Sequence, residues 1–442
     1  MNSARGLAWR VLINLSEGKE TAEILLRREL AATKLSTVDR SLTWELVIGA
    51  IRWRGFLDYA IEAYLTQPLE NLDTAVLELL RLGAYQLLRL DRVPAYAALN
   101  STVELAKQHQ QTIRAAGLVN AVLRKISKGY PPLPSAAKDP AGHLAIRLSH
   151  PRWLVERWLA RFGFDETARL LEFNNQPAET FFFLNTTKVK NLAGLGDTTF
   201  TASAVEGFPD CYRITSGRNL TASPAYQEGL LNPGNPATLL APLLLTPAAG
   251  EAVLDACAAP GGKLFHLRRL GGAGVSLTAL ELQKKRVKTL RLTNERLALD
   301  ATIQQGDLLD PPFAEESFDK LLLDVPCTNT GVLRRRVEAR WRRTPADIEK
   351  LPQLQGKLLR AAAKLLKPGG RLAYSTCSLE PEENEAVIED FLAEHSDFRL
   401  VKPAEQLPSE LRGFADESGY IRSLPQRSGH DGAFVALLER IG

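Results

Sequence analysis

Two cysteines stand where an alternating strand and helix pattern would place reactive groups. Cys377 lies in the run Tyr-Ser-Thr-Cys-Ser, at the carboxyl end of a short buried strand predicted over 371–375. Cys327 follows a second predicted strand at 318–324. In open α/β sheets, ligands bind just beyond the carboxyl ends of the strands. Because neighbouring strands are about 4.8 Å apart, both thiols are expected to reach one substrate.

A loop of small residues forms a second candidate site. The segment 255–263, Asp-Ala-Cys-Ala-Ala-Pro-Gly-Gly-Lys, joins a predicted strand to a helix, and its small side chains let a ligand approach the backbone. Glu281 and Asp307 end the next two predicted strands, where carboxylates can contact a ribose or lie beside an adenine. The loop is neither Gly-x-Gly-x-x-Gly nor a Walker sequence. Together with the two acids, it favours a nucleoside cofactor over an ordinary tight turn.

The elements that position these residues follow from hydrophobic patterning. Strands are predicted at 253–256, 274–281, 301–305, 318–324 and 371–375, with helices at 283–296 and 345–366. This alternation predicts an α/β fold with a doubly wound, mostly parallel sheet over 226–442. One more strand is predicted at 433–438, with an antiparallel orientation as one interpretation. The turn Lys-Pro-Gly-Gly at 367–370 is expected to close the helix before the strand that carries Cys377.

The first half of the chain has a different pattern. Apolar residues at three- and four-residue spacing predict an all-α domain over 1–130, followed by a Pro-rich linker at 131–145. The segment 146–225 reads as a small α+β domain with a helix at 153–171 and a strand at 181–185. Its three consecutive phenylalanines are expected to be strand core rather than a platform for stacked bases.

Composition narrows the class of protein. The 442 residues are more than a single hydrophobic core usually supports, so more than one domain is expected. The formal net charge of +4 permits an anionic partner without requiring one. The four cysteines form no Cys-x-x-Cys pair, so neither a disulfide framework nor a zinc site is expected, and a reducing cytoplasm fits. Cys211 and Cys257 are interpreted as non-catalytic. No signal peptide or membrane span is expected.

Two basic regions suggest a nucleic-acid partner. The arginine runs 334–336 and 340–343, with a tryptophan at 341, follow the strand that precedes Cys327. We expect them to contact RNA, since arginine pairs with phosphate and tryptophan can stack on a base. The basic residues near 114–128 fit either an RNA-contacting or a solvated face.

Three motifs resemble the signatures of the NOL1/NOP2/Sun family of RNA cytosine-5 methyltransferases: the loop 255–263, Asp-Val-Pro-Cys at 324–327 and Ser-Thr-Cys-Ser at 375–378. The segments 92–100 and 117–124 resemble a NusB-type RNA-binding domain, which narrows the resemblance to the bacterial RsmB (Sun, Fmu) type. It implies a C-terminal Rossmann-like methyltransferase sheet, preceded by an all-α NusB-like bundle and the small α+β domain. It also implies S-adenosylmethionine as the methyl donor.

The resemblance assigns roles residue by residue. Cys377 would attack carbon 6 of a cytosine, which makes carbon 5 nucleophilic, and Cys327 would help to remove the carbon 5 proton and release the product. Asp324 would hold the pyrimidine edge, and Lys263 would support the same site. The implied cofactor contacts are Cys257, Ala258, Ala259, Pro260, Gly261, Gly262, Lys263, Glu281, Asp307 and Asp324. Asn329 stands where the family usually has glycine, and Pro233-Gly234-Asn235-Pro236 also departs from the family pattern.

The expected function is formation of 5-methylcytosine in 16S rRNA by a cytoplasmic monomer that needs no metal or membrane and acts on naked RNA or an early assembly intermediate. The same chemistry on tRNA is an alternative. A non-catalytic RNA-binding assembly factor is another, and it would tolerate loss of both thiols. A thiol-redox protein is the third, although the chain lacks a Cys-x-x-Cys pair.

Overall fold

The computed structural model describes residues 3–18, 20–196, 198–217, 220–402 and 407–442. The chain forms two compact units. The first contains Met1–Gln176 and Leu333–Arg342, and the second contains Pro177–Val332 and Arg343–Gly442. The chain therefore passes between the units three times. Among the described residues, no helix is both long and apolar enough to cross a bilayer.

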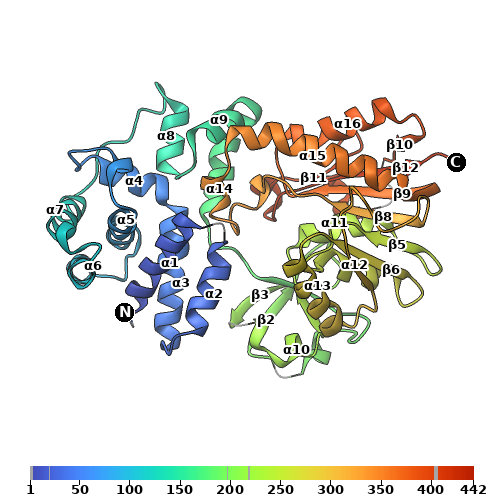
Figure 1. The fold of residues 1–442 in the computed structure, drawn as a ribbon, viewed down its shortest axis with the longest axis horizontal. Coiled ribbons are helices and arrows are strands. Elements are labelled where there is room, and N and C mark those ends of the chain that lie inside the picture. Colours follow the sequence, from blue (N-terminus) through green and yellow to red (C-terminus); the bar gives the residue numbers. More distant parts are fainter. Residues whose placement is uncertain (1–2, 19, 197, 218–219, 403–406) are drawn as a thin grey trace. The chain divides into compact units, whose positions relative to one another are not determined.

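The first unit is helical, as the three- and four-residue apolar spacing predicted (Figure 1). Side-chain caps set several helix starts, for example Ser3, whose hydroxyl accepts from Gly6 N. Apolar faces of α1, α3, α5 and α7 form one buried core. The α-helices are α1 Ala4–Glu17, α2 Ala22–Ala31, α3 Thr37–Arg52, α4 Arg54–Glu62, α5 Thr74–Arg89, α6 Ala95–Gln108, α7 Ala116–Ile126, α8 Pro140–Arg147, α9 Arg152–Asn175 and α14 Ala339–Arg342.

The segment 333–342 returns from the second unit and packs within the first. The guanidinium of Arg340 is 1% exposed and donates to the carbonyl oxygens of Arg52 and Ser149 at 3.0 and 2.9 Å. The indole of Trp341 donates to Ile51 O at 2.7 Å. The expectation that this basic run contacts RNA is wrong for Arg340, because its guanidinium is buried and donates inside the protein. For Trp341, whose half-buried ring was expected to stack on a base, it stays a prediction.

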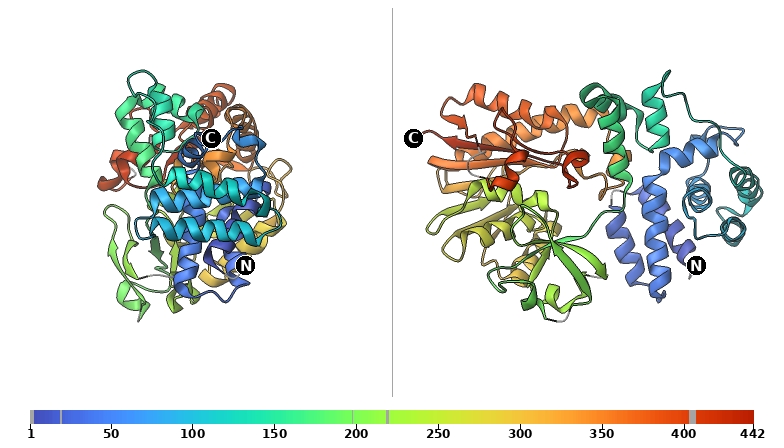
Figure 2. Two further views of the ribbon diagram at one scale, coloured as in Figure 1. Left: turned by 90° about the vertical axis from the view of Figure 1, so that its left-hand side faces the viewer. Right: turned by 180° about the vertical axis from the view of Figure 1, so that it is seen from behind.

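The second unit begins with a small antiparallel sheet in the order β2-β3-β1-β4. Its strands are β1 Phe181–Leu184, β2 Phe200–Ala204, β3 Cys211–Gly217 and β4 Leu231–Pro233. The three phenylalanines of β1 are at most 4% exposed, which confirms them as core rather than a base-stacking platform. The right-hand view of Figure 2 shows these green strands beside the helices of the larger sheet. Phe181 and Phe183 share a buried core with Leu264.

The larger sheet has the order β10-β12-β9-β8-β5-β6-β7, and β11 pairs with β12. The pairs from β9 to β7 are parallel and β12 is antiparallel, so the predicted doubly wound sheet and the antiparallel interpretation of the last strand are confirmed. The strands are β5 Ala252–Asp255, β6 Ser276–Glu281, β7 Thr302–Gln305, β8 Phe318–Asp324, β9 Leu366–Thr376, β10 Phe398–Leu400, β11 Ile421–Ser423 and β12 Ala433–Arg440.

Helices cover both faces of this sheet (Figure 1). Because side chains alternate along a strand, Val253 of β5 packs on one face and Leu254 on the other. The first face is covered by α11 Leu240–Leu245, α12 Gly262–Gly271 and α13 Lys284–Leu297. The second is covered by α15 Pro345–Lys364 and α16 Glu385–Glu394. This burial on both faces explains why the parallel strands read as nearly continuous apolar runs.

The prediction of a turn at 367–370 is wrong. Helix α15 ends at Lys364, and β9 runs from Leu366 through the glycine pair to Thr376. The register against β8 shifts between Phe318 and Lys320, and Gly369 has φ +75°. The Pro-Gly-Gly sequence therefore forms an irregularity inside the strand rather than a boundary before it.

Candidate active site

The two cysteines meet at the carboxyl ends of adjacent parallel strands. Asp324 of β8 lies opposite Ser375 of β9, so the segments that follow these strands emerge side by side. The Sγ atoms of Cys327 and Cys377 are 3.0 Å apart. The structure thus brings together the pair that the sequence placed at two strand ends.

Glu383, in a short helical turn at Pro381–Glu383, ties the two cysteine segments together. Its buried carboxylate accepts from Thr328 N at 2.8 Å and from Gln355 Nε2 at 2.9 Å. It also accepts from the hydroxyls of Thr328 and Ser378. One carboxylate thereby fixes a residue next to each cysteine.

Glu383→Ala is expected to lower methyl transfer at least about 100-fold, because displacement of reacting groups by about 1 Å has that effect. It should also lower the free energy of unfolding by about 3 kcal/mol, because buried donors lose their acceptor. Labelled methyl incorporation and urea denaturation measure the two effects. Glu389→Ala, which removes an exposed carboxylate on α16, is the matched control. Near wild-type activity in Glu383→Ala would show that this carboxylate does not position the thiols.

Close packing of two glycines holds the segment after Cys327 in place. Gly331 N donates to Cys377 O at 2.9 Å, and Gly432 N donates to Gly331 O at 2.7 Å. A Cβ on Gly331 would lie 2.8 Å from both Cys377 O and Gly432 Cα, which real side chains do not tolerate. Glycine at 331 is therefore required for this approach of three backbone segments.

Lys263 and Asp324 form an ion pair beside the thiols. Lys263 Nζ is 2.6 Å from Asp324 Oδ2. Burial lowers the pKa of Lys263, but Asp324 outweighs it and raises the pKa, so the ammonium stays charged. The pKa of Cys377 is well above its usual value because of its hydrogen bond to Cys327 and its burial, while Lys263 opposes this shift. The free protein therefore holds Cys377 as a neutral thiol.

A cavity of about 220 Å³ opens beside this pair, against the loop at 255–263. Helix α12 begins at the glycine pair, and Gly261 has φ +105°, which favours glycine. Of the predicted cofactor residues, the cavity is lined by Cys257, Ala258, Ala259, Pro260, Gly262, Lys263 and Asp324. Asn232, Pro233, Gly234, Thr238, Asp255 and His266 also line it and were not predicted.

Glu281 and Asp307 do not line this cavity. Glu281 is 3% exposed, accepts from Gln283 N at 2.9 Å and lies 3.2 Å from the Arg286 guanidinium. Asp307 is exposed, and its carboxylate accepts from Leu309 N. Their assignment to a ribose or an adenine stays a prediction.

Asp255 is the feature of the cavity that most clearly calls for a ligand. Its side chain is 1% exposed, and no described residue donates a well-formed hydrogen bond to either carboxylate oxygen. Burial, followed by the repulsion from Asp324, raises its pKa to about 7. Lys263 and the backbone N–H of Cys257 lower this pKa but do not offset the burial, so the carboxylate is matched by a ligand that carries a cationic amino group.

The other two cysteines have surroundings unlike those of the pair. Burial raises the pKa of Cys211 to about 12, and Cys257 is likewise raised by burial and by nearby carboxylates. Neither contacts the paired thiols, and Cys257 lines the cofactor cavity. Their separation from the paired thiols fits the interpretation of both as non-catalytic.

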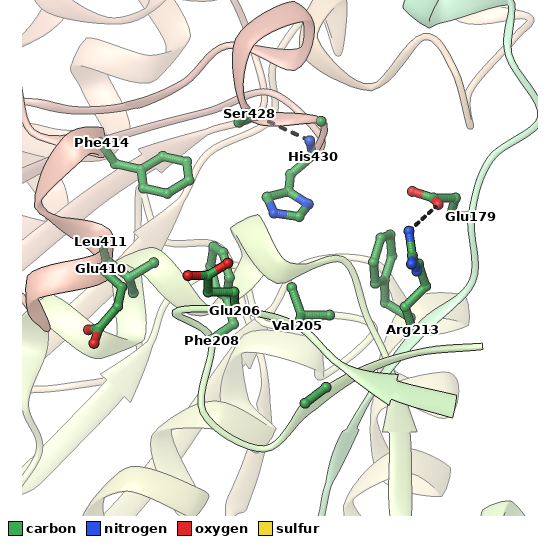
Figure 3. A pocket seen from close by; sticks show the side chains of 13 residues that line it. Glu179, Val205, Glu206, Phe208, Arg213, Glu410, Leu411, Phe414, Ser428 and His430 are labelled. Atoms are coloured by element: carbon green, nitrogen blue, oxygen red, sulfur yellow. Dashed lines mark hydrogen bonds and ion pairs between the residues drawn. The ribbon is translucent and has the colours of Figure 1, made fainter. Parts of the chain in front are cut away.

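A larger hollow of about 620 Å³ lies elsewhere in the second unit (Figure 3). Aromatic and acidic side chains surround its His430, whose ring packs edge-on against Phe181 and Phe208. Its walls come from five separate chain segments, so no local sequence motif predicts it. No residue of the predicted site lines it.

The fold and the site define a Rossmann-like S-adenosylmethionine-dependent methyltransferase with a helical N-terminal region and an intervening small domain. Three family models match the chain: the 16S rRNA methyltransferase RsmB/F model at residues 242–439, the NusB family at 2–128 and the RsmF/B-like ferredoxin-like domain at 150–221. The fold class expected from the motifs is confirmed.

Relatives match over nearly the whole length. The probable ribosomal RNA small subunit methyltransferase B of Bacillus subtilis is 33% identical over 100% of this chain and 99% of that protein. The Pseudomonas putida ribosomal RNA small subunit methyltransferase B is 34% identical over 98% of each chain. The crystal structure of PH0851 is 28% identical, covers 99% of both chains and has a TM-score of 0.84. The chain therefore belongs to the ribosomal RNA small subunit methyltransferase B family.

Proposed function

We propose that this protein transfers a methyl group from S-adenosylmethionine to carbon 5 of a cytosine in 16S rRNA through a covalent adduct. The observation that carries the proposal is the pair of thiols 3.0 Å apart, next to the Lys263–Asp324 ion pair and the cofactor cavity. The substrate class follows the relatives, which are named as small-subunit rRNA methyltransferases.

The chain's own residues divide the reaction between them. Cys377, once ionised, adds to carbon 6 and makes carbon 5 an enamine-like nucleophile. Cys327, adjacent to it, takes part in removing the carbon 5 proton so that the thiol can be expelled. Asp324 holds the pyrimidine edge, and Lys263 pairs with Asp324 and favours the Cys377 thiolate.

The cavity fits the methyl donor. S-adenosylmethionine supplies an electrophilic methyl group and carries a cationic amino group, which the buried Asp255 carboxylate would accept. The small residues at 257–262 would let its nucleoside part approach the backbone. Glu281 and Asp307 are proposed to complete the nucleoside contacts.

Asp255→Asn tests this assignment through pH dependence. A carboxyl pKa near 7 in the folded protein, against about 3.9 in the unfolded chain, means that the folded state holds the extra proton between these values. Stability therefore falls as pH rises from about 4 to 7, by about 4 kcal/mol in total. Asp255→Asn should lose this pH dependence of stability. Without cofactor, the variant should be more stable than wild type at pH 8.

The same variant should bind S-adenosylmethionine at least about 10-fold more weakly at pH 8, where wild-type Asp255 is ionised. Calorimetric titration and thermal unfolding with and without the donor measure both effects. Glu315→Gln, which removes one exposed carboxylate, is the charge-matched control. An unchanged affinity for S-adenosylmethionine in Asp255→Asn would show that this carboxylate does not bind the cofactor.

Bisulfite mapping of RNA from cells with and without the gene tests the function itself. The expected result is one cytosine in 16S rRNA that loses its protection when the gene is absent. Protection lost in tRNA instead would favour tRNA methylation. A non-catalytic assembly factor predicts normal cellular function when both thiols are replaced. We further propose a cytoplasmic monomer that acts on naked 16S rRNA or an early assembly intermediate.

A further inference from the structure

Asn329 lies against both members of the thiol pair. Its Nδ2 donates to Cys327 O at 2.9 Å, and its Oδ1 accepts from Cys377 Sγ at 3.3 Å. Its backbone has φ +66°, a left-handed conformation that asparagine tolerates better than most residues. Backbone and side chain therefore place a single amide between the two cysteines.

The orientation of this amide follows from its partners. A carbonyl oxygen can only accept, so the NH₂ end must face Cys327 O and the oxygen end must face the sulfur of Cys377. The oxygen in turn requires that Cys377 donate its thiol proton. The same proton lies within reach of the Cys327 sulfur, 3.0 Å away, and a hydrogen bond donated by Cys377 to either acceptor favours the neutral thiol.

We propose that Asn329 is a positioning residue that holds Cys377 as a neutral thiol in the free enzyme by accepting a hydrogen bond from its sulfur. This inference deepens the proposed function, which assigns attack to Cys377 but not the place of its proton. Because thiols react with electrophiles through the thiolate, the contact protects the nucleophile until substrate arrives.

Other groups near the two thiols shift the pKa of Cys377 in opposite directions, and these groups are retained when Asn329 is changed. Asp324 and Cys327 favour the neutral thiol of Cys377, and Lys263 favours the thiolate. Arg343 also donates to Cys327 O, at 3.0 Å. The buried carboxylate of Glu383 contacts the neighbouring Thr328 rather than either sulfur.

The test measures the thiol directly, in the full-length protein without RNA or methyl donor. The rate of iodoacetamide reaction at Cys377 is followed against pH by peptide mass mapping. Asn329→Gly keeps the left-handed backbone accessible and removes the acceptor, so the midpoint of the pH profile should fall. Reaction at pH 7 should become about 3- to 10-fold faster.

For Asn329→Asp we expect the opposite change in the reactivity of Cys377. A carboxylate at the same place repels a thiolate, so the midpoint should rise and reaction at pH 7 should slow. Ala298→Gly, at another left-handed position with φ 52°, is the backbone control and should match wild type. For Asn329→Gly, a faster reaction with an unchanged midpoint would indicate only better access of the reagent and would overturn the proposal. A rise in the midpoint for this variant would overturn it as well. Because no methylation is measured, these outcomes are independent of the proposed function.

Discussion

Cys377→Ala is expected to reduce methyl transfer to the background rate, a loss of at least about 10⁴-fold, because Cys377 is the group assigned to add to carbon 6 of the base. Cofactor binding and the free energy of unfolding should change little. The side chain lies at the end of β9 rather than in the sheet core, so its removal leaves no large cavity. Labelled methyl incorporation into 16S rRNA and calorimetric titration with S-adenosylmethionine measure the two quantities.

Cys211→Ala is the matched control, since it removes a thiol that is buried in the core and held neutral. It should retain methyl transfer. If Cys377→Ala still transferred methyl groups at a measurable fraction of the wild-type rate, addition of this thiol to the base would not be part of the mechanism.

Cys327→Ala should produce the opposite failure, a protein that starts the reaction and cannot release its product. With Cys377 intact, the adduct with carbon 6 forms, but loss of the carbon 5 proton is slowed, so expulsion of the thiol is slowed as well. A protein–RNA species that survives denaturing electrophoresis should accumulate. Its amount should approach one RNA per protein molecule, while turnover falls to background.

The double variant Cys327→Ala, Cys377→Ala should form no such species, because the attacking sulfur is absent. If Cys377→Ala accumulated the adduct and Cys327→Ala did not, the two roles would be reversed. If neither single variant trapped RNA, the thiol pair would have a role other than covalent attack and release.

The sequence was sufficient to predict the thiol pair. Each cysteine stands in a short motif directly after an apolar strand, and adjacent parallel strands present their carboxyl ends at one edge of the sheet. The family resemblance implied that Lys263 and Asp324 serve one site, and the structure shows them in contact. These are local patterns whose spatial meaning follows from the sheet order alone.

Glu383 could not be predicted in the same way. It stands in a run of three carboxylates in four residues, at 380–383, and nothing local distinguishes the one that turns toward Thr328 and Ser378. Its role depends on two segments that meet only in the folded sheet. The strand through Pro-Gly-Gly at 368–370 could not be predicted for a related reason, since it depends on the pairing of Leu366 and Arg371, on either side of it, with β8.

Arg340 shows how long-range packing can reverse a local interpretation. A cluster of arginines beside a predicted active site is typical of RNA contact. The acceptors that surround Arg340 belong to residues 52, 149, 174 and 175, up to 288 positions away in the chain. No pattern within the basic run itself carries that information.

Because residues 333–342 belong to the helical unit, they also affect when this unit can finish folding during protein synthesis. The helical unit includes Met1–Gln176, but it is complete only when Leu333–Arg342 is present. At roughly 5–20 residues per second, a ribosome needs on the order of ten seconds or more to travel from the first part to the second. During that interval the carbonyl oxygens that later receive Arg340 have no guanidinium to bind. The last buried contacts of the N-terminal helical unit can therefore form only after the ribosome has synthesised the segment that follows Cys327.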